Sequence, residues 1–194
     1  MKILVLDNYD SFTYNLVYII RELGYGESMD IIRNDKISLE EVDAYDKILL
    51  SPGPGLPSEA GIMPELIRKY APTKDILGIC LGNQAIGEAF GGGLINLTEV
   101  VHGVATKIKI KPDPLFEGLP EYFTVGRYHS WVIDATLFPE ALEVISKTPD
   151  GQIMAVKHKE FAVRGLQFHP ESILTEHGVQ IIKNWIEGIK ITNQ

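Results

Sequence analysis

Short apolar runs alternate with amphipathic stretches over the first half of the chain. The apolar runs have the composition of strands buried on both faces of a parallel sheet, and the stretches between them place apolar residues at helical spacing. Strands are predicted at 2–7, 28–34, 47–51 and 75–80, and helices at 12–23, 63–70 and 84–90. Ser11 is a candidate N-cap for the first helix, and Ser38 with Glu41 predicts the capping box of a further short helix.

The pattern changes beyond the glycine triplet at 91–93. Strands are predicted at 100–111, 122–128, 142–147, 152–158 and 161–168, and a last helix at 176–190. The apolar stripe of that helix consists of Ile181, Ile182, Trp185, Ile186 and Ile189. Regular alternation of strand and helix predicts an α/β fold with an open, mostly parallel, flavodoxin-like sheet, helices on both faces and a strand-rich second half. Since no linker interrupts the pattern, residues 1–194 are predicted to form one domain.

Composition narrows the classes of function. The 194 residues carry a net charge of −8, and no run of basic residues offers a binding surface for nucleic acid. No apolar run approaches the length of a membrane span, and the N-terminus lacks the pattern of a signal peptide. The one cysteine, Cys80, cannot form an intrachain disulfide, which suggests a reducing, cytoplasmic location. Neither paired cysteines nor an H-E-x-x-H motif argues for a metal.

The strongest local signal is Gly78-Ile79-Cys80-Leu81-Gly82, between a predicted strand and a predicted helix. This is the pattern of a nucleophile elbow, in which a sharp turn exposes the nucleophile and the flanking glycines avoid a collision with adjoining backbone. The turn also directs the amide of Leu81 toward the sulfur as one half of an oxyanion hole.

A second oxyanion donor is expected from the loop Ser51-Pro52-Gly53-Pro54-Gly55, after the third predicted strand. Prolines have no N–H, so only Gly53 or Gly55 can donate from the core of this loop. In a parallel sheet this loop and the elbow lie at the same carboxyl edge, where open α/β folds bind ligands. Pro-Gly-Pro-Gly alone is usually a simple turn.

A nucleophilic thiol needs a partner. Lowering its pKa by two units from about 8.5 requires about 2.7 kcal/mol, whereas a helix N-terminus typically supplies about 0.3–1 kcal/mol. Among the five histidines, His169 is favoured because it follows a predicted strand and precedes Glu171 by two residues. In extended geometry both side chains point the same way, so Glu171 could orient His169 toward Cys80. A lone cysteine after an apolar run is more often a core residue, but the joint occurrence of these groups at strand ends favours a catalytic Cys-His-Glu triad.

Several segments together resemble the class I glutamine amidotransferases. They are Asp7-Asn8-Tyr9-Asp10-Ser11-Phe12-Thr13, the loop 51–55, Gly78 to Gln84, Tyr128-His129-Ser130 and Gln167-Phe168-His169-Pro170-Glu171-Ser172. The first of these, and Ile173-Leu174-Thr175 after the last, are typical of the branch that serves chorismate-using enzymes.

The resemblance implies a glutaminase. Cys80 would attack the side-chain amide of L-glutamine, His169 would transfer the proton, and Glu171 would orient His169. It further implies oxyanion donors at Gly53 and Leu81. The glutamine-binding positions that it implies are Gly53, Pro54, Gly55, Gln84, Ser130 and Trp131. Two residues depart from the family's pattern: Asn83 replaces the commoner His or Met, and Trp131 replaces the commoner Leu.

The resemblance also implies a partner and no cofactor in this subunit. Ammonia would pass to a separate chorismate-binding subunit, component I of anthranilate synthase in tryptophan biosynthesis or of aminodeoxychorismate synthase in folate synthesis. Two other hypotheses stay open. One is a stand-alone cysteine amidase or γ-glutamyl hydrolase, and the other is a non-catalytic flavodoxin-like module in which Cys80 is merely packed.

Overall fold

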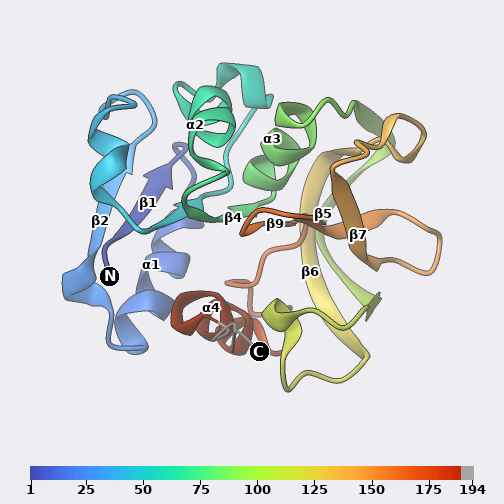
Figure 1. The fold of residues 1–194 in the computed structure, drawn as a ribbon. Helices are drawn as coiled ribbons and strands as arrows, with labels where there is room; N and C mark the ends of the chain where they lie inside the picture. Colours follow the sequence, from blue (N-terminus) through green and yellow to red (C-terminus); the bar gives the residue numbers. More distant parts are fainter. Residues whose placement is uncertain (189–194) are drawn as a thin grey trace.

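The computed structural model describes residues 1–188, and within them nine strands form one sheet. The strand order is β2-β1-β3-β4-β9-β8-β7-β5-β6 (Figure 1). The strands are β1 (Ile3–Asp7), β2 (Met29–Arg33), β3 (Lys47–Leu50), β4 (Asp75–Ile79), β5 (Leu94–Ile110), β6 (Tyr122–Ile133), β7 (Leu142–Lys147), β8 (Ile153–His158) and β9 (Val163–Leu166). The first five strands in this order run parallel, and the remaining pairs are antiparallel.

Four α-helices cover the two faces of the described sheet. They are α1 (Thr13–Glu22), α2 (Met63–Tyr70), α3 (Leu81–Ala89) and α4 (Gly178–Glu187). Helices α2 and α3 lie on one face, and α1 and α4 on the other (Figure 1). Each pair closes its own apolar cluster against the buried strands. None of the helices in residues 1–188 is long and apolar enough to cross a membrane.

The predicted α/β fold is confirmed, including the parallel order of the first strands and the strand-rich second half. The second half is where the bounds differ most. Strand β5 begins at Leu94 and β6 continues to Ile133, because the two form a long hairpin whose register shifts twice. β-Bulges let such a ladder continue past residues that break the alternation. The pattern therefore predicted a start for the first of these strands that is too late, at 100, and an end for the second that is too early, at 128. That residues 1–194 form a single domain stays a prediction.

Local details of the helices also differ. Phe12, and not Ser11, is the N-cap of α1; its N–H is bound by the side chain of Asp10 at 2.7 Å. Ser38 and Glu41 do form the two reciprocal capping bonds, but the helix that follows is a single 3₁₀ turn, Glu41–Ala44. The described part of the last helix is Gly178–Glu187, and the predicted positions 189–190, Ile189 among them, lie outside the described residues.

Helix α3 packs unusually close to the sheet through two glycines. A Cβ on Gly82 would lie 2.7 Å from the carbonyl oxygen of Leu50 in β3, and a Cβ on Gly78 would lie 2.5 Å from the backbone of Gly82. Both clashes are with backbone, which cannot rotate away. The two glycines therefore set the distance between α3 and the sheet, and with it the position of Cys80 at the start of the helix.

We expect Gly82→Ala to lower the free energy of unfolding by about 1–3 kcal/mol, because the new methyl group has no room beside Leu50. Urea denaturation measures the change. Gly26→Ala is the matched control, since the closest atom to its Cβ would be in the flexible side chain of Arg21, and backbone would be in ordinary contact at 3.8 Å. Equal stability of the two variants would contradict the close packing of α3.

Candidate functional site

Cys80 lies at the sharp turn between β4 and α3, as the sequence predicts. Its backbone has φ 52° and ψ −100°, a conformation that non-glycine residues rarely adopt. The N–H of Cys80 donates to the carbonyl of Leu166 at 2.7 Å, and the N–H of Gln84 donates to the carbonyl of Cys80 at 3.0 Å. The strained turn is therefore held on both sides, by β9 and by the first turn of α3.

His169 and Glu171 form a short, buried contact behind the sulfur. The Nδ1 atom of His169 lies 2.6 Å from Oε1 of Glu171, and both side chains are at most 2% exposed. The sequence predicts this pair in extended geometry, but β9 ends at Leu166 and the pair sits in a turn, where the N–H of Ser172 donates to the His169 carbonyl. The turn brings the two side chains together and leaves Nε2 of His169 on the opposite edge of the ring.

Two aromatic rings fix the plane of the imidazole. The ring centroids of Phe12 and Tyr128 lie 5.2 Å and 5.1 Å from that of His169, both in edge-on geometry. Phe12 comes from the loop after β1, and Tyr128 comes from β6. Segments from three parts of the chain thus hold His169, which excludes water from the pair that it forms with Glu171.

The electrostatics favour the charged imidazole. Burial lowers the pKa of His169, but interactions with Cys80 and then with Glu171 outweigh it and raise this pKa to about 10. Nε2 itself has no partner with hydrogen-bonding geometry among the described residues. His169 is consequently arranged to hold a proton on the side of Cys80 while the Glu171 carboxylate compensates its charge.

His129 lies near this site, but both of its ring nitrogens have other hydrogen-bond partners. Its Nε2 accepts from Nε of Arg127 at 3.1 Å, so its proton sits on Nδ1, 3.2 Å from the carbonyl oxygen of Trp131. Burial and the Arg127 charge lower the pKa of His129 to about 3. With both ring nitrogens engaged and the ring neutral, His129 is not free to take a proton from Cys80.

The loop after β3 packs directly against the elbow. A Cβ on Gly53 would lie 2.7 Å from side-chain atoms of both Asn8 and Leu81, so the backbone passes between them. Gly55 has φ +74°, a conformation that suits glycine. A hollow of about 530 Å³ opens beside the loop, lined by Pro54, Gly55, Leu81 and others. The structure therefore brings the two predicted oxyanion segments together at the carboxyl edge of the sheet.

Asn8 anchors this loop from the neighbouring strand. Its backbone N–H donates to Oγ of Ser51 and its Nδ2 donates to the carbonyl of Ser51, both at 2.8 Å. The side chain of Asn34 donates to Oδ1 of Asn8 at 2.9 Å. The carboxyl ends of β1, β2 and β3 are thus bound into one unit, and Gly53 is positioned by it.

Three further predicted residues lie across α3 and β6. Nε2 of Gln84 donates to the carbonyl oxygen of Trp131 at 2.9 Å, so position 131 engages α3 through its main chain. Ser130 precedes it in β6, opposite the register shift between Asn96 and Val101 of β5. The departure to tryptophan at 131 leaves this main-chain contact intact.

The sulfur makes two contacts that the sequence analysis did not predict. Sγ of Cys80 lies 3.8 Å from the carbonyl oxygen of Tyr128 and 3.7 Å from Nε2 of Gln167. Gln167 is fully buried. A polar residue near the end of a mainly apolar predicted strand was the available signal, since buried amides require specific partners.

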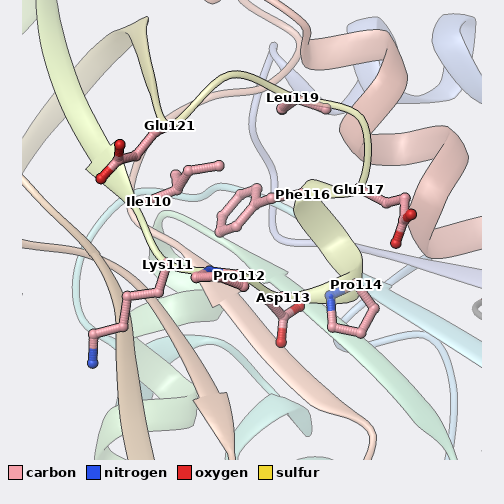
Figure 2. A pocket seen from close by; sticks show the side chains of 9 residues that line it. All are labelled: Ile110, Lys111, Pro112, Asp113, Pro114, Phe116, Glu117, Leu119 and Glu121. Atoms are coloured by element: carbon pink, nitrogen blue, oxygen red, sulfur yellow. The ribbon is translucent and has the colours of Figure 1, made fainter.

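Another hollow lies away from this site. It measures about 470 Å³ and is lined by Ile110, Asp113 and Phe116 among others (Figure 2). Asp113 is bound by Nε of Arg164, near the amino end of β9, at 2.7 Å. Cys80 and His169 instead follow the carboxyl ends of β4 and β9. None of the predicted site residues lines this hollow.

Comparison with known proteins gives a matching family, one relative of similar length and one longer relative. The family described as "Glutamine amidotransferase class-I" matches residues 4–189. The "Aminodeoxychorismate/anthranilate synthase component 2" of Bacillus subtilis is 41% identical over 187 residues, which cover 95% of each chain. The "Bifunctional protein TrpGD" of Thermotoga maritima is 43% identical over 95% of this chain, which spans only 32% of that longer protein.

A solved structure extends the likeness to the fold. A glutamine amidotransferase from Thermotoga maritima superposes with a TM-score of 0.71, covering 96% of this chain and 81% of that one. The sequence identity of this pair is 18%, so the comparison concerns the fold alone.

The interactions with Cys80 and with the Glu171 carboxylate should keep His169 protonated to high pH. Because the pKa of His169 is raised to about 10, the ring should hold its proton from below pH 6.5 until the pH rises through that value. We expect Glu171→Gln, which removes the charge but keeps the shape, to move the titration of His169 to lower pH. NMR titration of the labelled imidazole measures both values, and a His169→Asn variant assigns the signal. Identical titrations with and without the carboxylate would contradict the ion pair.

Proposed function

Since the chain belongs to the class-I glutamine amidotransferase family and resembles component 2 of anthranilate and aminodeoxychorismate synthases, we propose that it releases ammonia from L-glutamine through Cys80, His169 and Glu171. The observation that carries the proposal is the placement of Cys80 on a strained elbow beside the buried pair of His169 and Glu171. A nucleophile, a base and a group that orients the base are the minimum for covalent acyl transfer.

In the first step, Sγ of Cys80 attacks the carboxamide carbon of glutamine. His169, which already holds the proton given up by the thiol, passes it to the departing nitrogen, so that ammonia leaves and a glutamyl thioester remains. Water then attacks the thioester with His169 as base, which gives glutamate and restores the thiol. Glu171 stays ionised throughout and stabilises the imidazolium that each step forms.

The negative charge that develops on the carboxamide oxygen needs donors that are already in place. Leu81 is the first residue of α3, so its N–H has no partner within the helix and points out of the helix N-terminus. Gly53 packs against the Leu81 side chain and supplies the second N–H in this proposal. One such donor is worth about 3–4 kcal/mol of transition-state stabilisation.

The hollow beside Pro54 and Gly55 is large enough for the amino-acid end of glutamine. In this proposal Gln84, Ser130 and the Trp131 backbone, from α3 and β6, would also hold the substrate. Gln84 is already fixed by its bond to the Trp131 carbonyl, so little side-chain entropy is lost when glutamine binds.

The product dictates a partner. Ammonia that escaped to bulk water near neutral pH would be protonated, and ammonium has no lone pair with which to attack an electrophile. We therefore assign this chain a chorismate-binding component 1 as its partner, with direct transfer of ammonia between the two. The name of the B. subtilis relative includes both anthranilate synthase and aminodeoxychorismate synthase. We propose component 1 of anthranilate synthase as the partner, with component 1 of aminodeoxychorismate synthase as the alternative.

We expect Cys80→Ser to reduce glutamine-supported product formation by the complex by at least about 10³-fold while ammonia-supported formation stays nearly unchanged. His169→Ala should act in the same way, and Glu171→Ala should have a smaller effect because it performs no bond chemistry. Assays of each variant with component 1, with either glutamine or ammonium salt as nitrogen donor, measure the difference.

Parallel loss of both activities in Cys80→Ser would rule out this division of labour. Glutaminase turnover measured with and without component 1 separates the proposal from a stand-alone amidase, which would be fully active alone. If a glutamine-mimicking electrophile failed to label Cys80, the residue would be a packing residue only.

A further inference from the structure

The Cys80 sulfur has two polar contacts that favour opposite protonation states. The Tyr128 carbonyl, at 3.8 Å, can only accept, so it stabilises the thiol. The amide of Gln167 donates from Nε2 at 3.7 Å, and a donor stabilises the thiolate. The thiolate is the form that attacks, which makes the Gln167 contact the one that serves catalysis.

The orientation of the Gln167 amide is fixed by its neighbours. The Trp131 carbonyl requires a donor, so Nε2 of Gln84 faces it, and the second N–H of that group points to Oε1 of Gln167 at 3.4 Å. Nδ2 of Asn83 also approaches Oε1 of Gln167 at 3.4 Å. A flipped Gln167 would direct its own N–H groups at the N–H of Gln84, whose orientation the Trp131 carbonyl fixes. Oε1 therefore faces α3, and Nε2 is left to face the sulfur.

We propose that Gln167 is a further catalytic residue, which donates a hydrogen bond to Cys80 and stabilises its thiolate. The inference rests on the proposed function, because it concerns the nucleophile of that reaction. Gln167 is fully buried, and its backbone N–H donates to the Met154 carbonyl at 2.8 Å. This hydrogen bond holds the backbone at position 167 in place. In such an environment a hydrogen bond to a charged atom is worth more than it is in water.

Gln167 complements His169 because it cannot itself take the proton. The titratable groups around the sulfur are His169, with Glu171 behind it, and the neutral His129 of β6 beyond the Tyr128 carbonyl. When His169 gives its proton to the departing nitrogen, its positive charge disappears while the thioester forms and ammonia leaves. When the thiolate is regenerated as leaving group, the neutral Gln167 amide is still in place to receive it.

The test is the pH dependence of Cys80 reactivity in Gln167→Met, which keeps the length of the side chain and removes the N–H. We expect the acidic limb of the iodoacetamide alkylation rate, and that of kcat/KM for glutamine in the complex, to move to higher pH by about one unit or more. Gln180→Met is the matched control, since it removes an exposed amide of α4 that bonds only to Asn184. Its profile should superimpose on that of the unaltered chain.

Gln167→Glu provides a second variant that keeps an acceptor for Asn83 and Gln84. It replaces the donor with a carboxylate, so the acidic limb should move in the same direction and further. The unaltered chain offers a measurement without any substitution. The side-chain amide protons of Gln167 should change their NMR resonance over the pH range in which Cys80 becomes reactive, and the change should vanish in Cys80→Ser.

The inference would be overturned if the pH profiles of the folded Gln167 variants coincided with that of the unaltered chain. It would also be overturned if the Gln167 amide resonance showed the same pH dependence in Cys80→Ser as in the unaltered chain. Failure of the proposed function gives a different result. In that case the unaltered chain would itself lack glutamine-dependent activity with component 1, whatever residue occupies position 167.

Discussion

The backbone of Cys80 is the constraint on which the rest of the site depends. A positive φ at a non-glycine residue costs of order 1–3 kcal/mol, and it persists only when the surroundings leave no alternative. Here β9 binds the N–H of Cys80, α3 binds its carbonyl, and Gly82 lets the helix approach β3 so closely that the turn cannot relax. The fold thus directs one sulfur atom at the segment that follows β9.

The polar groups around that sulfur come from buried positions, and contacts with neighbouring protein groups orient them. Glu171 fixes His169, the Trp131 carbonyl fixes Gln84, and Gln84 fixes Gln167. Each group is oriented before substrate arrives, so the reaction does not have to reorganise solvent dipoles around the developing charge. A dry, preorganised site also explains why the interactions of His169 with Cys80 and Glu171 outweigh the effect of its burial.

How far the sequence leads can be judged from particular residues. The parallel strand order and the elbow at Cys80 follow from short-range patterns, because buried strands and glycine spacing leave a local signature. The sequence predicted the contact between His169 and Glu171, which the structure contains. It predicted an extended backbone between them, whereas the two residues lie in a turn. Tyr128 and Gln167 lie 48 and 87 residues from Cys80, and the strand-end reasoning that paired Cys80 with His169 assigned neither of them a contact with the sulfur. The bulged hairpin of β5 and β6, which brings Tyr128 to the sulfur, was likewise not predictable from alternation alone.

Strand β6 contributes to the site mostly through its backbone, and this explains how sequence departures are tolerated there. The carbonyl of Tyr128 faces the sulfur, and the carbonyl of Trp131 accepts from both Gln84 and His129. A carbonyl is present whatever the side chain, so tryptophan at 131 changes the bulk beside the site and leaves its hydrogen bonds unaltered. The side chains that cannot vary in this way are those of Gln84 and Gln167, because each connects a backbone carbonyl or the sulfur to the next member of the network.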